Sequence, residues 1–206
     1  MGRPPITFSI IAHDPTTGQV GIAVASKSFA CGARVPFIRT GVGAIASQAK
    51  GNQIYGPRGL ALLAAGAAAA DTVRLLIAAD GDHDIRQLHV MDRQGRFAAH
   101  TGEQCLEWCG HLIKPTYSLA GNLLAGAAVL EDMAKAYEAM TTATFAVKLI
   151  AALKAGERAG GDKRGRQSAA LLIHGDKDWA LTDIRVDDHA DPLAELARLE
   201  EVQRQG

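Results

Sequence analysis

The sequence has no excess of charge of either sign, since Lys and Arg together number 22 and Asp and Glu also number 22. Proteins that bind nucleic acid or anionic membranes carry clustered positive charge, which supplies most of their attraction to phosphate. A balanced chain offers no such attraction. We therefore expect neither nucleic acid nor membrane among its partners, and a small molecule as its substrate.

Cysteines are few, and no long hydrophobic run is present. Cys31, Cys105 and Cys109 are too few for a disulfide framework in 206 residues. The C-L-E-W-C segment lacks the second Cys or His pair of a zinc site, which favours small buried side chains there. The opening M-G-R-P-P-I has no apolar signal-peptide region, and the Ala-rich residues 60–70 are too few to cross a bilayer. These absences predict a cytoplasmic protein without a bound metal.

Motifs that bind common cofactors are also missing. The sequence contains no P-loop, no G-x-G-x-x-G fingerprint and no G-x-S-x-G elbow, so we expect no cofactor. Aromatic residues make up only 5% of the chain. An Ala-rich helix such as residues 60–70 buries little surface by itself. We expect a homodimer or a higher homo-oligomer, because closed symmetric pairs are the commonest assembly.

What the sequence does contain is a regular succession of short strands and helices. The clearest signal is an opening hairpin, with strands at residues 7–12 and 19–26 around the turn D-P-T-T-G. Further strands are predicted at residues 35–39, 43–48, 86–91, 96–101, 117–120, 168–173 and 179–186. Helices are predicted at residues 57–69, 72–79, 127–140, 144–158 and 192–203.

This order predicts an α+β fold, because strands come in pairs and do not alternate with single helices as in a parallel sheet. Two antiparallel sheets packed face to face, with helices outside, account for it best. No linker, composition shift or internal repeat divides the chain. We therefore expect one domain over residues 1–206, a four-layer αββα sandwich in which residues 1–6 are an N-terminal extension.

The opening hairpin resembles that of N-terminal-nucleophile (Ntn) hydrolases, including proteasome β-type chains. The residues that carry this likeness are T-F-S-I-I-A-H-D-P-T-T-G-Q-V-G-I-A-V-A-S-K. In that superfamily a Thr, Ser or Cys begins the first strand of an αββα sandwich, which makes Thr7 the candidate nucleophile. Arg39 follows Thr7 by 32 residues, the separation at which proteasome β chains place a catalytic Lys. An arginine polarises the nucleophile but does not exchange a proton at neutral pH.

At family level the chain resembles the bacterial family labelled domain of unknown function 1028. The blocks that carry the likeness are T-F-S-I-I-A-H-D-P, G-I-A-V-A-S, G-V-G-A-I-A-S-Q-A, Y-G-P-R-G, G-N-L-L-A-G, G-G-D-K-R-G-R-Q-S-A-A-L-L and V-D-D-H-A-D-P-L-A-E-L. They extend from residue 7 to residue 199. The family is placed in the Ntn-hydrolase-like fold, and its chemistry is unassigned.

The same resemblance implies supporting residues around Thr7. In proteasome-like relatives an Asp and a Ser before a late strand support the nucleophile, which here are Asp162 and Ser168. Asn122, in G-N-L-L, is a candidate oxyanion-hole amide, although a turn-forming Asn reads equally well. Gln48 and the backbone around Asn52 follow a strand, and we expect them to face the same cleft.

Basic residues suggest the substrate. Lys27 ends the second hairpin strand and is the alternative base if Arg39 acts only by its charge. Together with Arg164 and Arg166, these residues favour a substrate that carries a carboxylate. The alternative for residues 160–168, which contain Arg164 and Arg166, is a glycine-rich surface loop whose charges are solvated.

Two functions follow from these residues. One is an amidohydrolase in which the α-amine of Thr7 serves as general base, which requires removal of the six residues that precede it. The other is a ligand-binding or assembly protein that keeps the fold without its chemistry.

Overall fold

The computed structural model describes residues 7–105, 107–161 and 164–206. The first sheet has six strands in the order β10-β9-β2-β1-β8-β7, and the second has four in the order β3-β4-β5-β6. The strands are β1 (Thr7–His13), β2 (Val20–Ser26), β3 (Pro36–Arg39), β4 (Gly43–Ala49), β5 (Arg86–Asp92), β6 (Phe97–Thr101), β7 (Trp108–Ile113), β8 (Tyr117–Leu124), β9 (Ser168–His174) and β10 (Ala180–Val186). Every strand pair is antiparallel.

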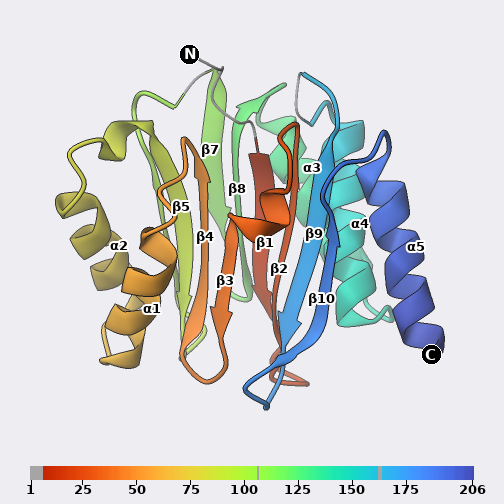
Figure 1. The fold of residues 1–206 in the computed structure, drawn as a ribbon, viewed down its shortest axis with the longest axis horizontal. Helices are drawn as coiled ribbons and strands as arrows, with labels where there is room; N and C mark the ends of the chain where they lie inside the picture. Colours follow the sequence, from red (N-terminus) through yellow and green to blue (C-terminus); the bar gives the residue numbers. More distant parts are fainter. Residues whose placement is uncertain (1–6, 106, 162–163) are drawn as a thin grey trace.

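Helices cover the outer face of each sheet (Figure 1). The helices are α1 (Tyr55–Ala64), α2 (Ala69–Ala78), α3 (Ala128–Ala139), α4 (Phe145–Arg158) and α5 (Pro192–Gln205). In Figure 1, α1 and α2 lie on one side and α3, α4 and α5 on the other. The predicted four-layer αββα sandwich of two antiparallel sheets is confirmed.

Period-two alternation on β1 explains the layers. Phe8 and Ile10 face α3 and α4 and belong to the largest apolar cluster, whereas Ile11 belongs to the cluster between the two sheets. Successive side chains of a strand point to opposite faces, so Thr7 and Ser9 share the inter-sheet face with Ile11. A third cluster joins the second sheet to α1 and α2. The central position of β1 therefore buries Thr7 at the end of the sandwich.

The two glycines of Y-G-P-R-G let α1 lie close to the second sheet. A Cβ on Gly56 would stand 2.4 Å from Cγ and Cδ1 of Phe37, and one on Gly59 would stand 2.3 Å from Cδ1 of Ile45. Both separations are far below a van der Waals contact. A Cβ at either position would therefore force the facing side chain to shift.

One strand was not predicted. β7 (Trp108–Ile113) pairs with β8 and forms an edge of the six-stranded sheet, with a register shift between Trp108 and Gly110. Its residues are only half-buried or exposed, so they lack the apolar alternation that marks a strand. Within the described residues, no helix is both long and apolar enough to cross a membrane.

Candidate active site

A row of polar side chains crosses four strands at one end of the six-stranded sheet. Thr7 is directly opposite Ser26 on β2 and Asn122 on β8, and Ser26 is opposite Ser168 on β9. All four are at most 3% exposed. Thr7 Oγ1 lies 3.2 Å from Ser26 Oγ, and Asn122 Nδ2 donates to the Thr7 carbonyl at 3.3 Å. The candidate nucleophile is therefore held through both its hydroxyl and its backbone.

Thr7 also lines a small cavity of about 120 Å³ between the sheets. The other lining residues are Ser28, Cys31, Arg34, Val35, Ser47, Gln48, Ala49, Gly51 and Gln53. Arg34 is the one charged side chain in this set of described residues. Burial raises the pKa of the Cys31 thiol to about 12, so Cys31 stays neutral. No histidine, lysine or carboxylate stands among these lining residues, so none of their side chains is a general base for Thr7.

Beneath the cavity, Gln87 on β5 organises a buried hydrogen-bond network. Its Nε2 donates to the backbone carbonyls of Gly110 and Gly121 at 3.0 and 2.9 Å. Carbonyls only accept, so the Oε1 of Gln87 must face the other way. There it accepts from Gln48 Nε2 at 2.8 Å and from Asn122 Nδ2 at 3.0 Å.

The same reasoning fixes which ring nitrogen of His89 carries the proton. Because Gln48 Nε2 donates to Gln87, the Oε1 of Gln48 lies on the side of Ser9. It accepts from the Ser9 hydroxyl at 2.6 Å. Ser9 has one proton, so His89 Nε2 must donate to Ser9 Oγ at 2.9 Å. His89 Nδ1 then accepts from Ser118 at 3.1 Å. Burial lowers the pKa of His89 to about 3, in keeping with this neutral imidazole.

These directions separate the roles of two amides. The Nδ2 group of Asn122 donates to the carbonyl of Thr7 and to Gln87 Oε1, so Asn122 supports the backbone of Thr7. One hydrogen of Gln48 Nε2 goes to Gln87, and the second is left for the cavity that Gln48 lines. Gln48, rather than Asn122, is placed to donate to a bound oxyanion.

Strained backbone gathers at this end of the sandwich. Of the non-glycine residues with positive φ in the described chain, Ala49 (65°) lines the cavity, Ala30 (52°) precedes Cys31 and Leu123 (56°) follows Asn122. Left-handed backbone costs a residue with a Cβ about 1–2 kcal/mol. Such strain concentrates at functional sites.

Arg39 does not lie in this site, and the prediction that it converges with Thr7 is wrong. It lines a separate cavity with His13, Val20 and His174. His13 and Val20 are paired at the opposite end of β1 and β2 from Thr7. The reason is that β3 starts beside the Thr7 cavity, which Val35 lines, and runs away from it to Arg39.

Asn52 is also turned away from Thr7. Its Nδ2 donates to Asp80 Oδ2 at 2.9 Å, and it lines an apolar cleft of about 410 Å³ between α1 and α2. Asp80 also accepts from Tyr55 Oη and Arg86 Nε, which hold its pKa well below the ordinary range despite burial. The Asn52 side chain therefore does not line the Thr7 cavity, whereas Gly51 and Gln48 do.

Ser168 contacts the wall of the cavity rather than Thr7 itself. Its Oγ donates to the Ser28 carbonyl at 2.6 Å and accepts from the Cys31 amide at 3.1 Å. Lys27 is not among the residues that line the cavity, and its ammonium donates to the Arg166 carbonyl at 2.9 Å. The structure therefore gives no support to Lys27 as a base for Thr7.

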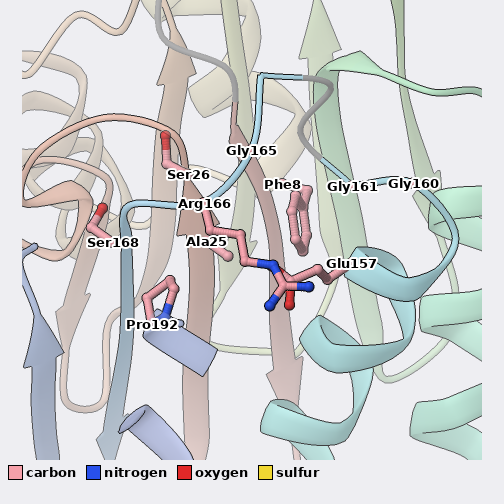
Figure 2. Close-up of a pocket in the computed structure, with 10 residues that line it drawn as sticks. All are labelled: Phe8, Ala25, Ser26, Glu157, Gly160, Gly161, Gly165, Arg166, Ser168 and Pro192. Atoms are coloured by element: carbon pink, nitrogen blue, oxygen red, sulfur yellow. The ribbon is translucent and has the colours of Figure 1, made fainter. Parts of the chain in front are cut away.

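Arg166 lies on the helix side of the sheet, in a cavity of about 100 Å³ (Figure 2). Figure 2 shows its side chain reaching toward Glu157 beside the ring of Phe8. Arg166 pairs with Glu157 at 3.0 Å and with Asp191 at 3.1 Å, so its charge is already neutralised. Arg164 lines neither this cavity nor the Thr7 cavity. Asp162 lies outside the described residues.

Sequence reasoning missed Arg34, Ser9, Gln87 and His89. A signal was present for the last two, because Gln87 and His89 alternate with the buried Leu88 and Val90 on one strand. Polar residues at period two on a buried strand indicate a polar inter-sheet face. Among the described residues, no group of three or more His, Cys, Asp or Glu side chains is arranged to hold a metal ion.

Residues 7–196 match a sequence family described as a family of unknown function, DUF1028. The chain belongs to this family. A Silicibacter pomeroyi protein assigned to DUF1028 is 33% identical, with 98% of this chain and 90% of that one covered and a TM-score of 0.91. Anbu, an ancestral β-subunit from Yersinia bercovieri, is 13% identical over 96% of this chain and 95% of that one, with a TM-score of 0.43. Comparison with curated proteins gives no match.

Proposed function

We propose that this DUF1028 chain is an N-terminal-nucleophile amidohydrolase that cleaves a small, carboxylated amide at Thr7. The observation that carries the proposal is the position of Thr7. Its hydroxyl heads the central strand, contacts Ser26 and lines a cavity that contains a buried amide, Gln48, and one cation, Arg34. The strained backbone around this cavity supports a functional rather than a purely structural role.

Acylation of Thr7 would be the first step. Because the described side chains that line the cavity offer no base, the α-amine of a Thr7 at the chain's start takes the hydroxyl proton, with an ordinary pKa near 7.7. Oγ1 bonds to the amide carbon, and the carbonyl oxygen becomes an oxyanion that accepts from the second N–H of Gln48. The α-ammonium then gives its proton to the substrate nitrogen. The C–N bond breaks and the amine leaves.

Deacylation uses the same groups in reverse. The α-amine takes a proton from water while the water oxygen bonds to the ester carbon. The C–Oγ1 bond breaks, and the proton passes to Oγ1, which restores the hydroxyl. The product is the free carboxylic acid, and each proton that the amine accepts is returned.

A ligand-binding protein without catalysis is the second candidate, and one observation favours it. Thr7 follows six residues in the sequence, so its nitrogen is acylated by Ile6 and has no basic lone pair.

Activity of a chain that begins at Thr7 tests the proposal. We expect this chain to hydrolyse members of a library of small carboxylated amides that the full-length chain leaves intact. Thr7→Ala should lower kcat by at least about 10³-fold, because the nucleophilic hydroxyl is lost even though the α-amine remains. Thr7→Ser should retain part of the activity, since its hydroxyl survives without the methyl group that restricts χ1.

The matched control is Ser26→Ala, which removes the neighbouring hydroxyl and leaves the nucleophile. We expect a smaller loss of activity in this variant than in Thr7→Ala. Equal turnover of the library by the full-length protein and by Thr7→Ala would reject the mechanism. A complete lack of turnover, with thermal stabilisation of the full-length chain by small acids, would favour the binding protein.

A further inference from the structure

The Thr7 cavity has one cationic side chain among the described residues that line it. Its polar walls are neutral hydroxyls and amides, among them Ser28, Ser47 and Gln53, and Arg34 supplies the charge. The Arg34 backbone amide donates to the Cys31 carbonyl at 3.1 Å, which ties Arg34 to another residue of the cavity wall. A small, partly buried space of this kind favours an anion.

Arg34 is held in place and keeps donors for a ligand. Its Nη2 donates to the backbone carbonyl of Phe29, in the loop that supplies Ser28 and Cys31 to the cavity. A guanidinium has further N–H groups in a planar fork that matches a carboxylate. One edge of the group is therefore anchored, and the remaining N–H groups are left for recognition.

The size of the cavity restricts the ligand. At about 120 Å³ it is much smaller than the roughly 300–1,000 Å³ of ordinary ligand pockets. Thr7 and Arg34 both stand on its walls. A carboxylate bound by Arg34 and a carbonyl attacked by Thr7 must then belong to one short fragment.

The acyl half of the substrate is the half that fits this small space. After the C–N bond breaks, the amine must depart before water attacks, whereas the acyl group stays bonded to Oγ1 through both steps. Resting on the function proposed above, we propose that the substrate is a monoamide of a short dicarboxylic acid. Its free carboxylate binds Arg34, and its amide carbonyl lies at Thr7.

Calorimetric binding to the full-length chain tests this without requiring turnover. The probes are malonate, succinate and glutarate, their half-amides, and the amino acids glycine, β-alanine and 4-aminobutyrate, which represent a carboxylated leaving amine. We expect at least one dicarboxylate or half-amide to bind, and the amino acids to bind at least tenfold more weakly. Preferential binding of the amino acids would overturn the assignment to the acyl half.

Substitution of Arg34 locates the carboxylate. We expect Arg34→Gln to weaken dicarboxylate binding at least tenfold and Arg34→Lys to restore it only partly, because lysine lacks the planar fork. Arg74→Gln on the surface of α2, where Arg74 pairs with Asp71, is the matched control and should leave binding unchanged. Circular dichroism checks that each variant is folded.

The outcomes separate the two proposals. Binding that depends on Arg34, with no hydrolysis by any chain that begins at Thr7, would reject the amidohydrolase and keep the carboxylate site. Hydrolysis with an unchanged KM in Arg34→Gln would keep the amidohydrolase and reject the carboxylate site. Equal dicarboxylate affinity in Arg34→Gln and the wild type would also reject the carboxylate site.

Discussion

Gln87 sets the direction of the hydrogen bonds between the two sheets next to Thr7. Two backbone carbonyls, of Gly110 and Gly121, fix the direction of its amide, and the orientations of Gln48 and Asn122 follow. Buried polar groups left without a partner cost about 1–3 kcal/mol each. The network therefore tolerates one arrangement, and that arrangement leaves an N–H of Gln48 for the cavity.

His89 gives this network a signature in the pH dependence of stability. Its folded-state pKa of about 3 lies below the ordinary 6.5, so between these values the unfolded chain binds a proton that the folded chain does not. The free energy of unfolding should then fall as pH is lowered through this window, by about 1.4 kcal/mol per pH unit at most from this group.

Urea denaturation between pH 6.5 and 4.5 measures this effect. We expect His89→Gln to be less stable than wild type at neutral pH but to lose less stability as pH falls. His13→Gln, at the far end of β1, is the matched control and should follow the wild-type slope. Identical slopes for wild type and His89→Gln would contradict a neutral, buried His89.

At the scale of elements, the glycines of α1 allow this helix to pack closely against the second sheet. Gly56→Ala gains up to about 1 kcal/mol of helix propensity but places a Cβ 2.4 Å from the Phe37 ring. Overpacking of a core costs about 1–3 kcal/mol. We expect a net loss of about 1 kcal/mol in the free energy of unfolding, measured in urea.

Gly81→Ala is the matched control, because a Cβ there meets nothing within 4 Å. We expect it to change the free energy of unfolding by less than about 0.5 kcal/mol. A Gly56→Ala chain as stable as Gly81→Ala would show that α1 does not need this close approach.

Elements with clear alternation were predictable from the sequence, and the site was predictable in part. The opening hairpin and the central place of β1 follow from two almost continuously buried strands joined by a D-P-T-T-G turn. Sequence separation placed Arg39 beside Thr7, but it does not tell which end of a strand a residue occupies. Arg34, which precedes β3, lines the Thr7 cavity instead, because β3 begins beside this cavity and runs away from it to Arg39.

At the scale of the whole molecule, the two sheets are covered unequally. α1 and α2 have 10 residues each, whereas α3 has 12 and α4 and α5 have 14 each. Ile54 and Leu75, which border the cleft between α1 and α2, are 43% and 40% exposed. The thin helical layer is the reason that we expect a homo-oligomer.

Sedimentation velocity at micromolar concentration measures the assembly. We expect a two-fold dimer as the main species, because isologous pairs close on themselves. Sedimentation of all the protein near 21.6 kDa would contradict this prediction.

The proposed catalysis depends on release of the Thr7 nitrogen. Since no described residue that lines the cavity offers another base, the proposed mechanism requires a chain that begins at Thr7. The most direct measurement is the intact mass, with the N-terminal peptide sequenced, of the protein purified from its native host. We predict a chain whose first residue is Thr7. A full-length chain that retains residues 1–6 and hydrolyses the carboxylated amides would contradict the mechanism.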